Sequence, residues 1–180
     1  FAVVRGKDGV AWGKGIAENV GQRAGPVKNE GDGRAPAGIF KLGTAFGYAS
    51  TATTQLPYLA LTPTTECVDD SQSRHYNELV DGAAIARDWN SSERMRRDDD
   101  MYRQGIFIEH NSPASPAMGS CIFFHIWRGP SLPTLGCTAM DQADISRLLG
   151  WLDPRQSPLL IQLPEAEYEH ARVSWNMPER

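Results

Sequence analysis

Glycine and proline recur along the whole chain, and this limits what it can fold into. The 180 residues include 17 glycines and 12 prolines, so uninterrupted apolar runs stay short. Both residues interrupt regular elements and favour turns, which predicts many short strands rather than a helical bundle. A chain of this length with 41% hydrophobic residues is large enough for one domain with its own core. We therefore expect one mostly-β domain.

Short apolar segments rich in Ile, Phe, Leu and Tyr are the strand candidates. We expect strands at Gly38–Leu42, Tyr58–Thr62, Gly105–Glu109, Cys121–Trp127 and Leu159–Leu163.

The first fifteen residues predict a hairpin. Its arms are Phe1–Arg5 and Val10–Gly15, and Lys7-Asp8-Gly9 forms the turn.

One helix is predicted with clear ends, from Gln142 to Leu152. Apolar residues recur there at i, i+3, i+4 and i+7, starting from Ile145. Asp141 is a suitable N-cap, and Pro154 prevents continuation.

Two further segments are strongly polar. Asn90–Arg103 is dense in charge, and we expect a solvated helix or lid there. Together with the residues before it, this segment predicts small helical insertions between 78 and 103. We place the domain at 1–164 and treat 165–180 as a polar tail that wraps the surface or frays.

Charge and hydropathy exclude two classes of function. The formal net charge is −4 and the sequence pI is about 5.6, whereas nucleic-acid binding needs a basic face, so we expect no nucleic-acid partner. No apolar run reaches 18 residues, so we expect no membrane span. The chain begins at Phe1 without an initiator Met, and we expect that a signal peptide has been removed from a periplasmic or secreted protein.

The three cysteines form an odd set, which allows three free thiols or one disulfide with one free thiol. A Cys67–Cys121 bridge is one arrangement, and it stays open because the sequence does not give the distance that bridging requires. In an oxidising compartment, a remaining free thiol usually has a chemical role.

The segment Ser120–Met140 carries the clearest chemical pattern. An apolar strand leads to His125, and a Pro- and Gly-rich loop then leads to Gly136-Cys137, shortly before the predicted helix. A cysteine near a helix start meets free peptide N–H groups and the positive end of the helix dipole, which favour the thiolate. The same N–H groups can stabilise an oxyanion, and an imidazole within reach completes a nucleophile–base pair. The alternative is that both residues simply pack in the core.

The order of these motifs resembles the YkuD-type L,D-transpeptidases. In that family a strand-end histidine is followed by a loop and then by Ser/Thr-His-Gly-Cys, where this chain reads Thr134-Leu135-Gly136-Cys137. The segment Glu30–Leu42 is similar to the family's Gly-x-x-x-Thr-Pro-x-Gly-x-Phe element. Further motifs resemble a divergent bacterial branch, and the likeness runs from about residue 2 to residue 163. These motifs are Ala45-Phe46-Gly47-Tyr48, Cys67-Val68-Asp69-Asp70 with Tyr76-Asn77, and His125-Ile126-Trp127-Arg128-Gly129.

The resemblance implies a YkuD-like β-sandwich with one helix after the nucleophile, and a cysteine acyltransferase that cross-links peptidoglycan stem peptides. Cys137 matches the nucleophile and His125 the general base, whose ring a main-chain carbonyl just after it would orient. The backbone N–H groups of Gly136, Cys137 and Thr138 match the oxyanion hole. No cofactor is required, and a carbapenem would be expected to acylate the thiol.

Two family positions differ in this chain. Leu135 replaces the family's second histidine, and Ala139 replaces the Arg that usually follows the cysteine by two residues. A substrate carboxylate then needs another cation, for which Arg128 is the first candidate and Arg34 the second.

The remaining polar candidates are assigned to substrate binding or to loop structure. The further substrate-binding candidates are Tyr48, Asp70, Tyr76 and Asn77. The last three could hold an ammonium or amide group of a peptide, or could order a loop. Adjacent carboxylates point to different sides of a strand, so Asp69 and Asp70 would rarely bind one ion, and we predict no metal site.

Two other functions remain open. A peptidoglycan L,D-carboxypeptidase or amidase would form the same acyl-enzyme and release it to water. A non-catalytic wall-binding module would use His125 and Cys137 for packing alone.

Overall fold

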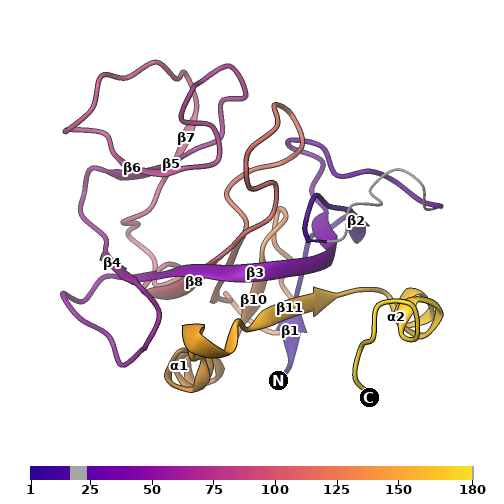
Figure 1. Ribbon diagram of the computed structural model, residues 1–180. Helices are drawn as coiled ribbons and strands as arrows, with labels where there is room; N and C mark the ends of the chain where they lie inside the picture. Colours follow the sequence, from indigo (N-terminus) through magenta and orange to yellow (C-terminus); the bar gives the residue numbers. More distant parts are fainter. Residues whose placement is uncertain (17–23, 180) are drawn as a thin grey trace.

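The computed structural model describes residues 1–16 and 24–179, and it is mostly β, as the sequence predicts (Figure 1). The larger sheet has the order β1-β10-β9-β8-β3-β11, with β2 and β4 also paired to β3. Its strands are β1 (Val3–Val4), β2 (Val10–Trp12), β3 (Ala35–Gly47), β4 (Tyr58–Ala60), β8 (Gln104–Ile108), β9 (Phe123–Ile126), β10 (Thr138–Met140) and β11 (Leu159–Gln162). A smaller antiparallel sheet has the order β6-β5-β7 and consists of β5 (Thr65–Val68), β6 (Leu79–Asp81) and β7 (Ser92–Arg94).

Strand β3 organises the larger sheet. It is 13 residues long and runs from near β4 to near β2 in Figure 1. It pairs in parallel with β2 and β4 and antiparallel with β8 and β11, with a register shift between Leu42 and Ala45. β3 therefore pairs with four other strands and lies next to the edge strand β11.

Alternate residues of β9 face two different cores. Phe124 and Ile126 belong to a cluster that includes Ile145 and Leu149 of α1. Phe123 belongs to a second cluster, which extends to Cys67 of the smaller sheet. Successive side chains of a strand point to opposite faces, so β9 is buried on both sides and His125 lies on the same face as Phe123.

Helix α1 (Gln142–Trp151) confirms the predicted helix. Asp141 caps it by accepting a hydrogen bond from the Ala143 N–H at 2.8 Å. Ile145 and Leu149 are buried from the apolar stripe and pack on β8 and β9. The chain turns away at Leu152, before the short 3-10 helix η1 (Pro154–Gln156).

The predicted hairpin at the start of the chain is wrong, although a turn closes at the expected place, where the Gly9 N–H donates to the Gly6 carbonyl at 3.0 Å. The two arms do not pair with each other. β1 pairs with β10 and β2 pairs with β3. An isolated two-stranded ribbon is only marginally stable, and each arm instead adds to the larger sheet.

The predicted helical insertions between 78 and 103 are also wrong. This stretch contains β6, β7 and turns, and β7 completes the smaller sheet. The tail contains a helix that the sequence analysis did not predict, α2 (Glu165–Ala171).

Cys67 and Cys121 form a disulfide with a Cα–Cα distance of 6.0 Å. The bridge joins β5 of the smaller sheet to the segment that enters β9, and it leaves Cys137 as the free cysteine. No helix among residues 1–16 and 24–179 is long and apolar enough to cross a membrane.

Candidate functional site

A cavity of about 790 Å³ opens on the β9 face that carries His125. Its walls come from β9, β10, the smaller sheet and three loops. The residues used below that line it are Lys28, Glu30, Asp69, Glu93, Arg97, Tyr102, His125, Arg128, Gly136, Cys137 and Ala139. The cavity therefore collects the predicted nucleophile and base together with several charged groups.

The strand register brings Cys137 and His125 to this wall. β10 runs parallel to β9, with Ala139 opposite His125. Cys137, two residues before Ala139, thus falls beside Phe123, whose N–H donates to the Cys137 Sγ at 3.4 Å. Paired residues share a face and residues two apart on a strand share it too, so the thiol and the imidazole are diagonal neighbours.

A backbone carbonyl orients the His125 ring. Its Nδ1 lies 2.9 Å from the Ile126 carbonyl oxygen, which can only accept, so Nδ1 carries the proton and Nε2 has its lone pair free. The carbonyl just after the histidine is the partner that the family resemblance implied. Burial lowers the pKa of His125, and the nearby Arg97 and Arg128 charges add to this effect. The ring is therefore neutral at pH 7 and can accept a proton.

Cys137 lies in surroundings that favour the thiol. Its residue exposure is 8%, and the Sγ donates to the Cys121 carbonyl at 3.4 Å. Burial strongly raises the pKa of Cys137 and the Glu93 charge raises it further, while the Phe123 N–H and Lys28 act in the opposite direction.

The expectation of a thiolate stabilised by the helix start is therefore wrong. The strand β10 lies between Cys137 and α1, and the dipole effect fades beyond the first turn of a helix. The resting pair is a neutral thiol and a neutral imidazole.

Tyr102, which the sequence analysis did not identify, contacts both His125 and Glu93. Its ring meets the His125 ring edge-on, with centroids 5.3 Å apart. Its hydroxyl donates to Glu93 Oε2 at 2.6 Å. Burial raises the pKa of Tyr102, as does the Glu93 charge, so Tyr102 is a neutral donor in the same buried cluster as Cys137.

Glu93 was expected on a solvated surface and instead lies on the cavity wall. Burial raises the pKa of Glu93, and the negative charges of Asp69 and Glu30 raise it further. Glu93 reaches the wall because β7 pairs with β5, which places Glu93 opposite Cys67.

Two more carboxylates complete an acidic wall, which we define as Glu30, Asp69 and Glu93. Ser120 donates to Glu30 Oε2 at 2.7 Å, and the Tyr76 hydroxyl donates to the same oxygen. Asp69 Oδ1 is buried and has no hydrogen-bond partner among the described residues.

The cations at the cavity differ in how they are engaged. Lys28 pairs with Asp32 at 2.6 Å, and Arg97 pairs with Asp99 at 2.9 Å. Arg128 is exposed and makes no ion pair within residues 1–16 and 24–179. Of the two cations predicted for a substrate carboxylate, Arg128 is the one at the cavity.

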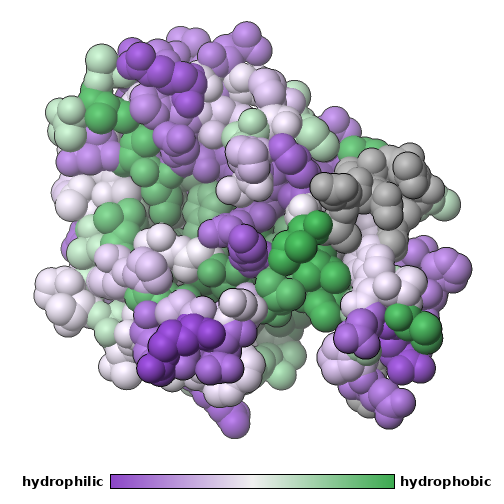
Figure 2. All heavy atoms as spheres, viewed as in Figure 1, coloured by the Kyte–Doolittle hydropathy of each residue, from purple (hydrophilic) through white to green (hydrophobic). Residues whose placement is uncertain are grey.

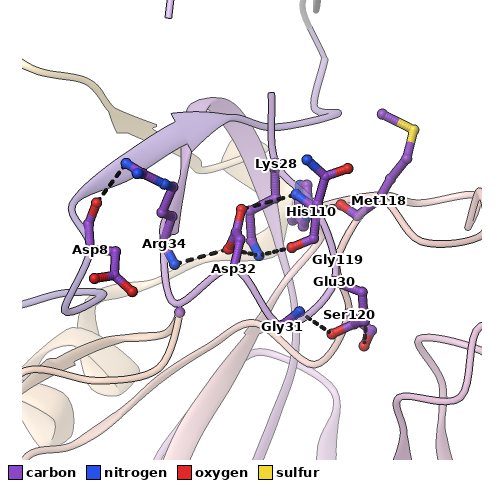
Figure 3. Close-up of polar contacts among 12 residues, drawn as sticks. Asp8, Lys28, Glu30, Gly31, Asp32, Arg34, His110, Met118, Gly119 and Ser120 are labelled. Atoms are coloured by element: carbon purple, nitrogen blue, oxygen red, sulfur yellow. Dashed lines mark hydrogen bonds and ion pairs between the residues drawn. The ribbon is translucent and has the colours of Figure 1, made fainter. Parts of the chain in front are cut away.

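Arg34, the other predicted cation, lies in a polar network beside the site (Figure 3). Its Nη1 donates to the Asp8 carbonyl at 2.6 Å, and its backbone N–H donates to Asp32 Oδ1 at 2.9 Å. Lys28 donates to the same Asp32 oxygen. The network fixes the loop that carries Glu30, and Arg34 does not line the cavity.

Four other predicted substrate-binding residues make contacts within the protein. The Tyr48 hydroxyl donates to the Asp99 carbonyl at 2.9 Å. Tyr76 is buried against Glu30, and burial raises its pKa, as does the bond to Glu30.

Asp70 and Asn77 organise loops. Asp70 accepts from the Gln72 and Asn90 N–H groups at 2.9 and 2.8 Å. Asn77 is buried and accepts from the Cys121 N–H at 2.9 Å. Neither lines the cavity, whereas Asp69 does.

The predicted oxyanion segment is held by Thr134. Its Oγ1 donates to the Cys137 carbonyl at 2.6 Å and accepts from the Gly136 N–H at 3.2 Å. The Gly136 N–H is therefore engaged, and Thr138 is the first residue of β10. Of the three predicted donors, Cys137 is the one whose N–H neither donates to Thr134 nor belongs to strand β10.

A second, largely apolar cavity of about 610 Å³ lies on the other face of the sheet. Phe124 and Met140 line it, together with Leu148 of α1 and Leu160 of β11. Figure 2 views this side of the molecule and shows hydrophobic surface near the polar outer face of α1. Its lining contains no cysteine or histidine, so the predicted nucleophile and base both lie at the first cavity.

No group of three or more His, Cys, Asp or Glu side chains in the described part of the chain is placed to hold a metal ion. Comparison of the chain with known protein families, with curated proteins and with solved structures finds no match.

Proposed function

We propose that the chain is a cysteine acyltransferase of the bacterial cell wall, an L,D-transpeptidase with a YkuD-like β-sandwich, in which Cys137 is the nucleophile and His125 the base. The observation that carries the proposal is the pairing of β9 with β10, which puts both side chains on one face at one cavity. A histidine that precedes the cysteine in the chain fits this reading, whereas papain-like enzymes have the opposite order. The disulfide beside a free thiol fits a periplasmic or secreted protein.

The acylation step follows from the neutral resting pair. The His125 Nε2 accepts the Cys137 proton as the sulfur attacks the carbonyl carbon of an L-centre in a stem peptide. The Cys137 N–H stabilises the resulting oxyanion. The intermediate collapses to a thioester, and His125 returns the proton to the departing amine of the D-residue.

The transfer step reverses these roles. The amine of a second stem peptide attacks the thioester carbonyl, and His125 accepts a proton from that amine. The new amide forms, the thiolate leaves, and it recovers its proton from His125. Arg128 is our candidate for contacting a substrate carboxylate.

The test is to incubate the wild-type protein with purified stem tetrapeptides and to analyse the products by mass spectrometry. Cross-linked dimers are expected, together with a covalent adduct on Cys137 after exposure to a carbapenem. His125→Gln should lower the rate by about 10²- to 10⁴-fold, since this is the usual contribution of a general base.

Cys137→Ala is the matched control and should give neither dimer nor adduct. Shortened monomers without dimers would replace the transferase by a carboxypeptidase or amidase. If wild-type protein and Cys137→Ala both bind wall fragments and neither forms any product, a non-catalytic module is supported instead.

A further inference from the structure

We infer that Tyr102, anchored by Glu93, is a positioning residue that holds the His125 ring in the orientation from which it accepts the Cys137 proton. The inference rests on the proposed function, because it concerns the base of that same reaction. Tyr102 acts through His125 and makes no bond to the reacting atoms.

Hydrogen bonding holds one side of the His125 ring and leaves the other side free. Nδ1 lies 2.9 Å from the Ile126 carbonyl oxygen. Nε2, the atom that has to face the thiol, makes no hydrogen bond within residues 1–16 and 24–179. A ring tethered at one atom can still tilt, so the direction of the Nε2 lone pair depends on what packs against the ring.

The Tyr102 ring supplies this packing contact. The centroids of the Tyr102 and His125 rings are 5.3 Å apart and the ring planes differ by 82°, which is the edge-to-face geometry that aromatic pairs favour. Within the described part of the chain, no second aromatic ring meets His125. Tyr102 therefore limits how far the imidazole can tilt.

Tyr102 is itself held on several sides, so it can restrain a neighbour. Its ring meets those of Phe46 and Phe123 edge-on, with centroids 6.0 and 5.5 Å away. The Arg97 guanidinium lies over the ring, 5.4 Å from its centroid. The residue is buried, and these contacts leave its ring little freedom to move.

The Tyr102 hydroxyl is committed to an anchor in the smaller sheet. It donates to Glu93 Oε2 at 2.6 Å, and a phenol has one proton to donate, so this group does not donate to the thiol or to a substrate. Glu93 belongs to β7, where strand pairing places it opposite Cys67. The smaller sheet thus reaches the base through one hydrogen bond and one ring contact.

The first test removes the ring and measures acylation of Cys137 by imipenem with intact-protein mass spectrometry. Tyr102→Leu should lower the maximal acylation rate about 10²-fold, because misplacing a reacting group by about 1 Å has an effect of this size. The imipenem concentration that gives half of the maximal rate should change little. Phe107→Leu is the matched control, because it removes a ring from the same cluster that contacts Phe123 instead of His125, and it should keep the wild-type rate.

The second test observes the His125 ring apart from catalysis. Nitrogen-15 NMR of Cys137→Ala protein reports the tautomer and the titration of each histidine, and His125→Gln assigns the signal. Tyr102 lines the cavity, so water can enter the space that Tyr102→Leu leaves. The pKa of His125 should then rise toward its ordinary value, because burial is the main cause that lowers it. The substitution leaves in place the charged groups that act on His125, which are Arg97, Asp99 and Arg128.

The third test addresses the anchor with a pair of variants at Glu93. Glu93→Gln keeps an oxygen that accepts from the Tyr102 hydroxyl, whereas Glu93→Ala removes it. Both variants lose the same negative charge, so the difference between them reports the hydrogen bond alone. Glu93→Gln should be acylated up to ~10-fold faster than Glu93→Ala, since one hydrogen bond contributes at about this level.

A wild-type acylation rate in Tyr102→Leu with an unchanged His125 titration would overturn the inference, and so would equal rates in the two Glu93 variants. A loss of rate that Phe107→Leu shares would overturn it too, because the cause would then be a loosened cluster. If Tyr102→Leu does not fold, the Glu93 pair decides, since it leaves every ring in place. The proposed function fails separately, if wild-type protein forms no adduct while NMR still shows that Tyr102 holds the ring.

Discussion

The reactivity of Cys137 depends on a balance between its burial and its neighbours. Burial and Glu93 raise the pKa of the thiol, and burial lowers the pKa of His125. Both effects disfavour a thiolate–imidazolium pair at rest. In the proposed mechanism, proton transfer to His125 then accompanies attack on the substrate, as it does in serine enzymes.

This predicts slow alkylation of Cys137. At pH 6.5 iodoacetamide should modify it more slowly than it modifies an unstructured peptide thiol, whose pKa is about 8.5, because only the thiolate reacts. The rate should continue to rise above pH 9.5, where the peptide thiol levels off. Peptide mapping by mass spectrometry gives the rates, and Cys137→Ala is the control for labelling elsewhere. Faster labelling than the peptide at pH 6.5 would show that the pair is ionised.

At the scale of the elements, the disulfide connects the two sheets that line the site. It joins β5 to the segment before β9 across a sequence separation of 54. The acidic wall comes partly from the smaller sheet and the reactive pair from the larger one. The bridge therefore couples the two walls of the cavity.

Removing the bridge should lower stability strongly. A closed loop of this length contributes about 4 kcal/mol in the chain-entropy treatment. We expect the double variant Cys67→Ser with Cys121→Ser to lose unfolding free energy of this order in urea, and wild-type protein in reductant to match it. A thiol count on the unfolded, unreduced chain should give one. A count of three, or equal stability of both proteins, would contradict a bridge in solution.

The elements that the sequence predicted well are those fixed by local patterns. Helix α1 has its apolar period and its Asp141 cap within one short segment, and both were found. β9 stands out as an apolar run. The hairpin prediction was wrong because the strands of Val3 and Val10 pair with β10 and β3, which are distant in sequence. Turn-forming residues do not determine such long-range pairing.

The candidate site likewise combines residues that local sequence patterns indicate with residues that only strand pairing brings to the cavity. Cys137 and His125 were identified from their order and context. Glu93 and Tyr102 were not, because a charged stretch looks solvated until strand pairing places one of its side chains inside. Asp69 and Asp70 were expected on opposite sides of a strand, but both follow β5 rather than belong to it, so strand alternation does not say which of the two meets the cavity.

At the scale of the whole molecule, buried histidines make stability depend on pH. Burial lowers the pKa of His110 to about 4, and the pKa of His125 moves in the same direction. The unfolded chain takes up these protons near pH 6.5 and the folded chain does not. Their contribution is therefore complete above pH 6.5 and declines as the pH falls toward 4.

Urea unfolding between pH 7 and pH 4 should show this loss, which for His110 is about 3 kcal/mol. His110→Gln keeps a donor for the Met118 carbonyl and should flatten the slope. His170→Gln, on the exposed side of α2, is the matched control. A wild-type slope that His110→Gln leaves unchanged would assign the pH dependence to other groups.

The alternation along β9 has a consequence for how this protein can change over time. His125 faces the cavity and Phe123 packs in the cluster on the same side, while Phe124 and Ile126 face the core beneath α1. Inserting or deleting one residue in β9 ahead of His125 would reverse which face each side chain occupies, and the imidazole would then lie in the hydrophobic core beneath α1. Substitutions can therefore alter side chains here, whereas an insertion or deletion between Cys121 and His125 would remove the imidazole from the cavity that the four-residue strand β9 lines.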